Sequence, residues 1–235
     1  MNTDHPKVYS ESQIFEMISQ YFITHGFNCA KLDPASHSKS HSIPDYEILQ
    51  NGHLVAYCEV KSPQYIVNAD TRMFQWNTLF NKLKTTTRKA AKQLTTHDPE
   101  NIYPKIVIYT SSHFQLMWLR FTDFLQGVIR GNGQIIRDFR TNTEYISELK
   151  KTLHLIDAFM WMQISSKDPE IIQISFFINK QSIHVDRTTQ ILSKLIPTSE
   201  LISCTNLHKN CSCYSHYFFY YNPEILQLLP FQDAI

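Results

Sequence analysis

The stretch IPDYEILQNGHLVAYCEVKSP, residues 43–63, decides the fold of this chain. Two short runs rich in apolar residues flank an Asn-Gly pair, a pattern that is typical of a β-hairpin. Because successive strand residues face opposite sides, Glu59 and Lys61 share one face of the second strand, away from the face of Cys58. A hairpin alone does not require charged residues on that face, so their presence indicates a functional role.

The position of Asp45 relative to Glu59 depends on the loop between the two strands. A two-residue Asn-Gly turn would place the two carboxylates on opposite faces, whereas a three-residue loop over residues 50–52 unites them on one face. We predict the three-residue loop, because such a loop normally ends in a residue with left-handed backbone, and Gly52 suits that position. In that register Asp45 lies opposite Tyr57, and Glu59 is its diagonal neighbour.

Two carboxylates on one face can converge on one cation. Hard divalent cations such as Mg²⁺ or Mn²⁺ take oxygen ligands, and the backbone carbonyl of Val60 could add another oxygen. A lysine beside the cation could orient or help to deprotonate an attacking water, and could neutralise charge that builds up on phosphorus. Lys61 suits that role, so the combination predicts hydrolysis of a phosphodiester bond.

Composition restricts the class of protein. The chain has 235 residues, of which 43% are apolar, so it can bury a full core. Its net charge of +1 predicts that any nucleic-acid site is a local patch. No run of residues has the length and apolarity of a membrane span or a signal peptide, and the five cysteines form no disulfide framework, so we expect a soluble, intracellular, cytoplasmic protein with reduced thiols.

Hydrophobic spacing predicts several elements before residue 111. Residues 10–27 are expected to form an amphipathic helix, with Ser10 as N-cap, Gln13 in the capping-box position and Gly26 at its end. The stretch at 28–42 is predicted to be a polar loop, and 68–95 to be one helix or two. The run KIVIYT at 105–110 is apolar and rich in β-branched residues, as in a buried central strand.

The pattern after residue 120 is weaker. We predict a helix over 121–133 that ends at a glycine, a strand over 134–139, a helix over 141–163, and a hairpin formed by 171–178 and 182–185.

Basic residues recur on the predicted helix over 68–95. Lys84, Arg88 and Lys92 are four residues apart, so they should stack into one stripe, with Gln93 beside it. Such a stripe is either a solvated helix face or a contact to a nucleic-acid backbone.

These residues resemble those of the PD-(D/E)xK phosphodiesterase superfamily, the restriction endonuclease-like nucleases, in Pro44-Asp45 and Glu59-Val60-Lys61. The helix FEMISQYFITHGF is similar to the opening helix of Mrr-like nucleases, in which a glutamate, here Glu16, reaches toward the metal. The resemblance implies an α/β fold with an αβββαβ core, a mixed central sheet flanked by helices. It implies that Asp45 and Glu59 are metal ligands and that Lys61 is the lysine near the water. Gln93 corresponds to the first residue of a Gln-x-x-x-Tyr motif that here ends in histidine.

We therefore expect a Mg²⁺- or Mn²⁺-dependent nuclease that acts on DNA, with RNA left open. A core over residues 1–140 would carry the site, and a mainly helical, partly β extension over 141–235 would follow, unless the two form one compact domain. One hydrolytic centre per chain would need a homodimer, or two successive events, to cut both strands. The alternatives are a silent nucleic-acid-binding or protein-interaction module on the same scaffold, and a solvated sheet face without chemistry.

A second group of residues lies near the C-terminus. Soft ligands for Zn²⁺ occur there close together, although their spacing is not that of a standard zinc finger. They are Cys204, His208, Cys211, Cys213 and His216. A zinc-stabilised interaction module is one hypothesis for this segment, and a loop that leads into an aromatic strand is the other.

Overall fold

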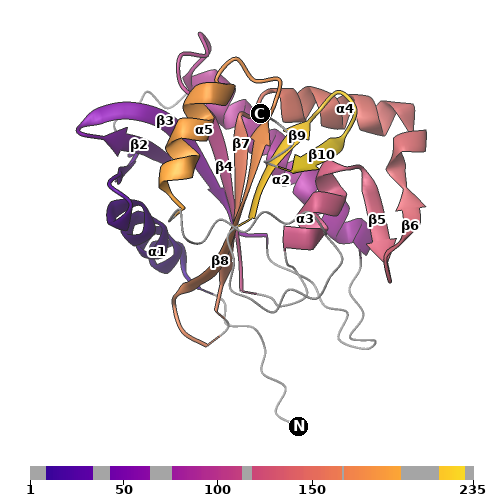
Figure 1. Ribbon diagram of the computed structural model, residues 1–235, viewed down its shortest axis with the longest axis horizontal. Coiled ribbons are helices and arrows are strands. Elements are labelled where there is room, and N and C mark those ends of the chain that lie inside the picture. Colours follow the sequence, from indigo (N-terminus) through magenta and orange to yellow (C-terminus); the bar gives the residue numbers. More distant parts are fainter. Residues whose placement is uncertain are drawn as a thin grey trace.

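The computed structural model describes residues 9–33, 43–63, 76–112, 118–165, 167–196 and 217–230. Its centre is a mixed eight-stranded sheet in the order β1-β2-β3-β4-β7-β8-β9-β10, with helices on both faces (Figure 1). The predicted α/β class with a mixed central sheet flanked by helices is confirmed. Among the described residues, no helix combines the length and the apolar character that crossing a membrane requires.

The first half of the chain supplies one edge of the sheet and its centre. The elements are α1 (Glu11–Thr24), β1 (Asn28–Lys31), β2 (Tyr46–Gln50), β3 (His53–Lys61), α2 (Trp76–His97) and β4 (Lys105–Ser111). Strands β1, β2 and β3 pair antiparallel, and β4 pairs parallel to β3 after the α2 crossover.

The second half of the chain completes the sheet. The elements are α3 (Trp118–Leu125), β5 (Val128–Gly131), β6 (Gln134–Asp138), the 3₁₀ turn η2 (Phe139–Thr141), α4 (Thr143–His154), β7 (Ala158–Ile164), β8 (Ile171–Asn179), α5 (Val185–Lys194), β9 (Tyr217–Asn222) and β10 (Gln227–Pro230). Strand β7 pairs directly with β4, so the sheet continues across residue 140 without a break. Strands β5 and β6 form a separate two-stranded ribbon at one side of the molecule (Figure 1).

The opening helix forms as its sequence predicts. Ser10 is the N-cap, its hydroxyl accepts from the Gln13 N–H, and the Gln13 side chain accepts from the Ser10 N–H, which completes the capping box. Gly26, with φ of 81°, follows the end of the helix in the left-handed conformation that glycine adopts without strain. The buried stripe of the helix consists of Ile14, Ile18 and Phe22.

The predicted three-residue loop of the β2–β3 hairpin is wrong. Gln50 pairs with His53, so the turn has two residues, Asn51 and Gly52, both with positive φ. A register shift follows, since Ile48 pairs with Ala56 while Leu49 pairs with Leu54. Val55 is therefore the extra residue of a β-bulge, and this one residue reverses the alternation that the short turn would have imposed.

Four other sequence predictions need correction. Residues 28–31, predicted as part of a polar loop, form β1 because they pair with β2. Residues 128–131, predicted as the end of a helix, form β5, since a turn at Gly127 ends α3 before them. The helix predicted over 141–163 ends at His154, and residues 158–164 form the strand β7. All seven residues of β7 are buried, whereas a helix on a sheet keeps one exposed face. The second arm of the hairpin predicted over 171–185 is absent, and α5 begins at Val185 instead.

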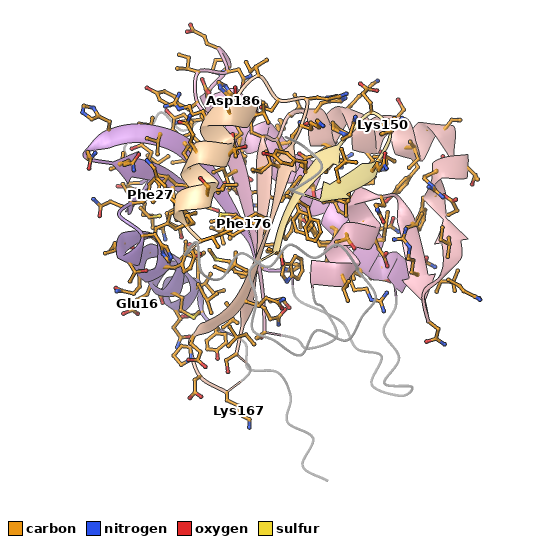
Figure 2. The ribbon with its side chains drawn as sticks, in the orientation of Figure 1. Glu16, Phe27, Lys150, Lys167, Phe176 and Asp186 are labelled. Carbon is orange, nitrogen blue, oxygen red and sulfur yellow. The ribbon has the colours of Figure 1, made fainter. Side chains whose placement is uncertain are left out.

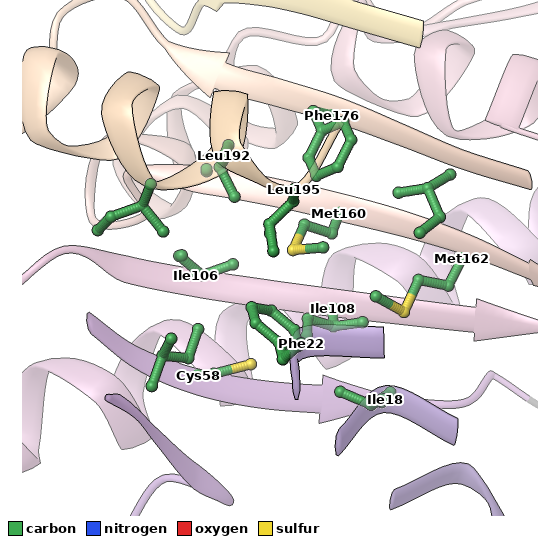
Figure 3. Packing of buried hydrophobic residues seen from close by; sticks show 14 of the residues in the cluster. Ile18, Phe22, Cys58, Ile106, Ile108, Met160, Met162, Phe176, Leu192 and Leu195 are labelled. Atoms are coloured by element: carbon green, nitrogen blue, oxygen red, sulfur yellow. The ribbon is translucent and has the colours of Figure 1, made fainter. Parts of the chain in front are cut away.

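Two apolar cores lie on the two faces of the sheet. Helices α2, α3 and α4 cover one face, over the side chains of Val107, Phe159 and Phe177. Helices α1 and α5 cover the other face, where Phe22 and Leu192 pack on neighbouring side chains of β3, β4, β7 and β8 (Figure 3). Each central strand thus contributes to both cores, as the continuous apolar runs of a buried sheet require.

Phe121 of α3 offers a test of the first core. Its ring is fully buried, with ring centroids 5.1 Å from Tyr109, 5.5 Å from Trp161 and 5.2 Å from Phe177. We expect Phe121→Ala to lower the free energy of unfolding by about 3–5 kcal/mol in urea denaturation, because it leaves a cavity among these rings. The control Ile136→Ala, at a side chain 62% exposed, should cost less than about 0.5 kcal/mol. Equal losses in the two variants would contradict the described packing.

Candidate functional site

Asp45 and Glu59 meet across the β2–β3 hairpin. Tyr46 pairs with Cys58, so the next position places Asp45 directly opposite Glu59, on the same face of the sheet. The Asp45 N–H donates to Glu59 Oε2 at 3.1 Å, and the Val60 N–H donates to Asp45 Oδ2 at 2.8 Å. Each carboxylate is therefore held by the backbone of the opposite segment. The predicted convergence of the two acids occurs, although through a bulge and a direct pair rather than a diagonal one.

Pro44 changes the hydrogen bonding of Val60. The same register places Pro44 opposite Val60, and the Val60 N–H points to this side of β3, toward Asp45. In a regular ladder the residue opposite would donate its N–H to the Val60 carbonyl, but proline has no N–H to donate. Pro44 therefore cannot supply the ladder donor for the Val60 carbonyl.

Glu59 is a buried acid. Its side chain is 0% exposed, whereas those of Asp45, Glu47 and Lys61 are half-buried, so Glu59 itself does not belong to a solvated strand face. Burial and the negative charge of Asp45 raise the pKa of Glu59 to about 7, against the opposing effects of Lys61 and the Asp45 N–H. Burial also raises the pKa of Asp45, partly offset by its hydrogen bond from the Val60 N–H. Both shifts reflect two acids brought close together away from water.

Lys61 and Gln93 complete the cluster. The Lys61 ammonium forms an ion pair with Glu59 Oε1 and donates to Gln93 Oε1 at 3.3 Å. The Gln93 amide in turn donates to the Ile43 carbonyl at 3.3 Å, just before the Pro-Asp pair. One side chain of α2 thus links the lysine to the segment that carries Asp45.

The structure does not bring Glu16 to this cluster. Glu16 is exposed on α1 and points away from the sheet (Figure 2), while the buried side of α1 packs on the face opposite to α2. Glu11, in the first turn of α1, is the acid of this helix whose charge acts on Asp45, raising its pKa, and Lys31 pairs with Glu11 at 3.1 Å. Sequence spacing gave no signal for Glu11, because its proximity arises from the packing of α1 at the end of β2.

The predicted basic stripe on α2 divides into two parts. Lys84 and Arg88 form ion pairs with Glu148 of α4, the latter at 2.8 Å. Lys92 is exposed on the outward side of the helix, one turn beyond Arg88, and Gln93 belongs to the cluster described above. Lys84 and Arg88 therefore face α4, not the acidic pair.

A divalent cation at this site would rely on few side chains. Within the described ranges, no group of three or more histidine, cysteine, aspartate or glutamate side chains could hold a metal ion. Asp45, Glu59 and the Val60 carbonyl offer three oxygens, which suits a hard cation that keeps several waters. The five predicted zinc ligands between Cys204 and His216 lie outside the described residues.

Comparison of the chain with known protein families, with curated proteins and with solved structures gave no match.

The buried acid gives a test by pH. A pKa raised from 4.5 to about 7 in the folded state contributes stability below pH 4.5 that is lost as the pH rises through 7. In metal-free buffer we therefore expect the free energy of unfolding to fall between pH 5 and pH 8 by on the order of 3 kcal/mol from this group. Glu59→Gln should remove most of that fall, as measured by urea denaturation at both pH values. An unchanged pH dependence in the variant would contradict the burial of an ionisable Glu59.

Proposed function

We propose that this protein is a metal-dependent nuclease that hydrolyses phosphodiester bonds, most directly in DNA. The observation that carries the proposal is the direct opposition of Asp45 and Glu59, with the Lys61 ammonium bonded to Glu59 and to Gln93. Two convergent carboxylates and a fixed lysine are the groups that metal-assisted phosphodiester hydrolysis needs.

The order of elements supports a place in the PD-(D/E)xK superfamily. The sequence α1-β1-β2-β3-α2-β4 follows the αβββαβ order that the resemblance implies. The Pro-Asp pair precedes β2 and the Glu-Val-Lys run ends β3, so the two halves of the motif occupy neighbouring strands. Glu16 departs from the pattern, and Glu11 is the acid of α1 that influences Asp45.

The residues present fit Mg²⁺ or Mn²⁺. Asp45, Glu59 and the Val60 carbonyl would hold the cation, which would supply a polarised water and offset the charge of the phosphate. In hydrolysis the oxygen of water bonds to phosphorus while the bond from phosphorus to the leaving oxygen breaks. Lys61 would orient that water and stabilise the negative charge that develops, while Gln93 fixes the position of the lysine.

One observation favours a second candidate, a silent nucleic-acid-binding or protein-interaction scaffold. Both oxygens of Glu59 already have partners, the Asp45 N–H and the Lys61 ammonium, so this buried carboxyl group is hydrogen-bonded without a cation. A fold by itself does not fix an activity, so a cleavage assay must decide between the two.

The cleavage assay uses single- and double-stranded DNA and RNA with Mg²⁺, Mn²⁺ or EDTA. We expect cutting that needs the cation and falls at least about 100-fold in Lys61→Ala and in Asp45→Asn, because each removes a group that acts on the reacting atoms. Glu47→Gln, on the same face of β2, is the matched control and should retain activity. Folded protein that cuts no substrate would favour the silent scaffold, and cutting that survives in Lys61→Ala would place the chemistry elsewhere.

Pro44 gives a second test, on cation binding itself. In Pro44→Ala the new N–H can donate a hydrogen bond to the Val60 carbonyl oxygen. That oxygen is then a weaker ligand for a cation. We expect Mn²⁺ to bind roughly 3–10-fold more weakly by titration calorimetry, with the fold unchanged. Pro104→Ala, on the other side of β3, is the control and should bind as the wild type does. Equal Mn²⁺ affinity in all three proteins would show that the Val60 carbonyl takes no part.

A further inference from the structure

Helix α2 concentrates positive charge. Its sequence, WNTLFNKLKTTTRKAAKQLTTH, contains no acidic residue and has lysine or arginine at positions 82, 84, 88, 89 and 92. The whole chain is nearly neutral, with 22 basic and 21 acidic side chains. This helix therefore carries positive charge that no acidic residue of the helix itself balances.

On one flank of α2, an acidic residue of a neighbouring helix balances the positive charge. Glu148 of α4 pairs with Lys84 and with Arg88, and the Lys84 ammonium lies 4.0 Å from the centroid of the Tyr145 ring. These two cations hold α4 against α2, and their charge is partly neutralised there. The Lys84 side chain, 17% exposed, is poorly placed to bind a large external anion, whereas the Arg88 side chain is 60% exposed.

The other flank is the side on which the acidic pair lies. At about 100° per residue, Lys89 is roughly 40° from Gln93 around the helix axis, whereas Lys84 is on the opposite side. Lys92 lies about 100° from Gln93, on the outward side between Lys89 and Arg88, about 60° from the first and about 40° from the second. Both lysines are exposed, and so are the neighbouring hydroxyl side chains of Thr85 and Thr96. We call Lys89, Lys92, Thr85 and Thr96 the lysine flank.

The direction of α2 leads the lysine flank away from the site. The His97 ring packs on Tyr57 with centroids 4.7 Å apart, Gln93 contacts Lys61, and Thr87 bonds to the Tyr109 hydroxyl at 2.7 Å. The helix thus runs antiparallel to β3 and β4, and its earlier turns extend past the end at which Lys61 lies. Lys89 is one helical turn from Gln93 in that direction, about 6 Å along the axis.

We propose that the lysine flank binds the phosphate backbone of the nucleic-acid strand that enters the site. The inference rests on the proposed function and adds to it the path of the substrate, along the outer side of α2 that carries Lys89 and Lys92 and not along the Lys84 side. Lysines read phosphate as point charges and threonine hydroxyls donate hydrogen bonds to phosphate oxygens, so the flank holds a strand without reading its sequence.

The test measures binding of a short fluorescein-labelled duplex DNA by anisotropy over a series of salt concentrations, in EDTA so that no cleavage occurs. The variant is Lys89→Glu with Lys92→Glu. We expect its affinity to fall at least about tenfold at low salt, and the slope of log affinity against log salt to decrease by about two.

The matched control is Lys150→Glu with Lys151→Glu on α4, which changes the net charge equally on a different helix (Figure 2). It should retain binding within about threefold. Thermal unfolding checks that both variants are folded. An equal loss in variant and control, no loss in either, or binding to anionic phosphatidylserine vesicles in place of DNA would overturn the proposal.

The cleavage assay separates this proposal from the proposed function. DNA binding that depends on Lys89 and Lys92 in a protein that cuts no substrate would leave the lysine flank assigned and the nuclease function refuted. Cutting that needs Lys61, together with DNA binding that is indifferent to Lys89 and Lys92, would leave the function standing and refute the flank.

Discussion

The burial of Glu59 is the constraint on which the site depends. A carboxylate removed from water is costly unless hydrogen bonds and an opposite charge compensate it. The Asp45 N–H and the Lys61 ammonium supply part of that compensation, and Gln93 of α2 holds the ammonium in place. Each partner comes from a different element, so the position of the acid depends on the hairpin and on the crossover helix together.

The two sides of α2 divide its charges between structure and solvent. Lys84 and Arg88 join α4 through Glu148, while Lys89 and Lys92 are exposed on the outward side of the helix. The inner side of the same helix packs Leu83, Ala90 and Leu94 into the core. A single helix thus anchors a neighbouring helix, covers the sheet and positions the lysine of the site, which explains why its sequence combines small apolar residues, threonines and bases but no acids.

Local signals predicted local structure well. The capping box at Ser10 and Gln13 and the apolar run of β4 can be read directly from the sequence, because a few adjacent residues determine them. Although the three-residue loop on which it rested was wrong, the shared face of Asp45 and Glu59 was also predicted. The bulge at Val55 was not, since it depends on how two strands settle against the rest of the sheet.

Long-range packing accounts for the other failures. The apolar residues of β7 resemble a continuation of α4 until β4 provides a partner on which they can pair as a strand. Likewise Glu148 lies far from Arg88 in sequence, and Glu11 affects Asp45 only because α1 packs near the end of β2. Sequence spacing describes one element at a time, whereas these relations arise between elements.

The bulge in the β2–β3 hairpin also restricts how this segment can vary. With a two-residue turn and one bulge, the number of residues between Asp45 and Glu59 has the parity that keeps both acids on one face. Deleting Val55 would remove the bulge and still leave Asp45 opposite Glu59, whereas deleting a residue of β2 would need a compensating bulge to keep both acids on one face. The bulge is therefore the place at which this hairpin can lose one residue without separating the two acids.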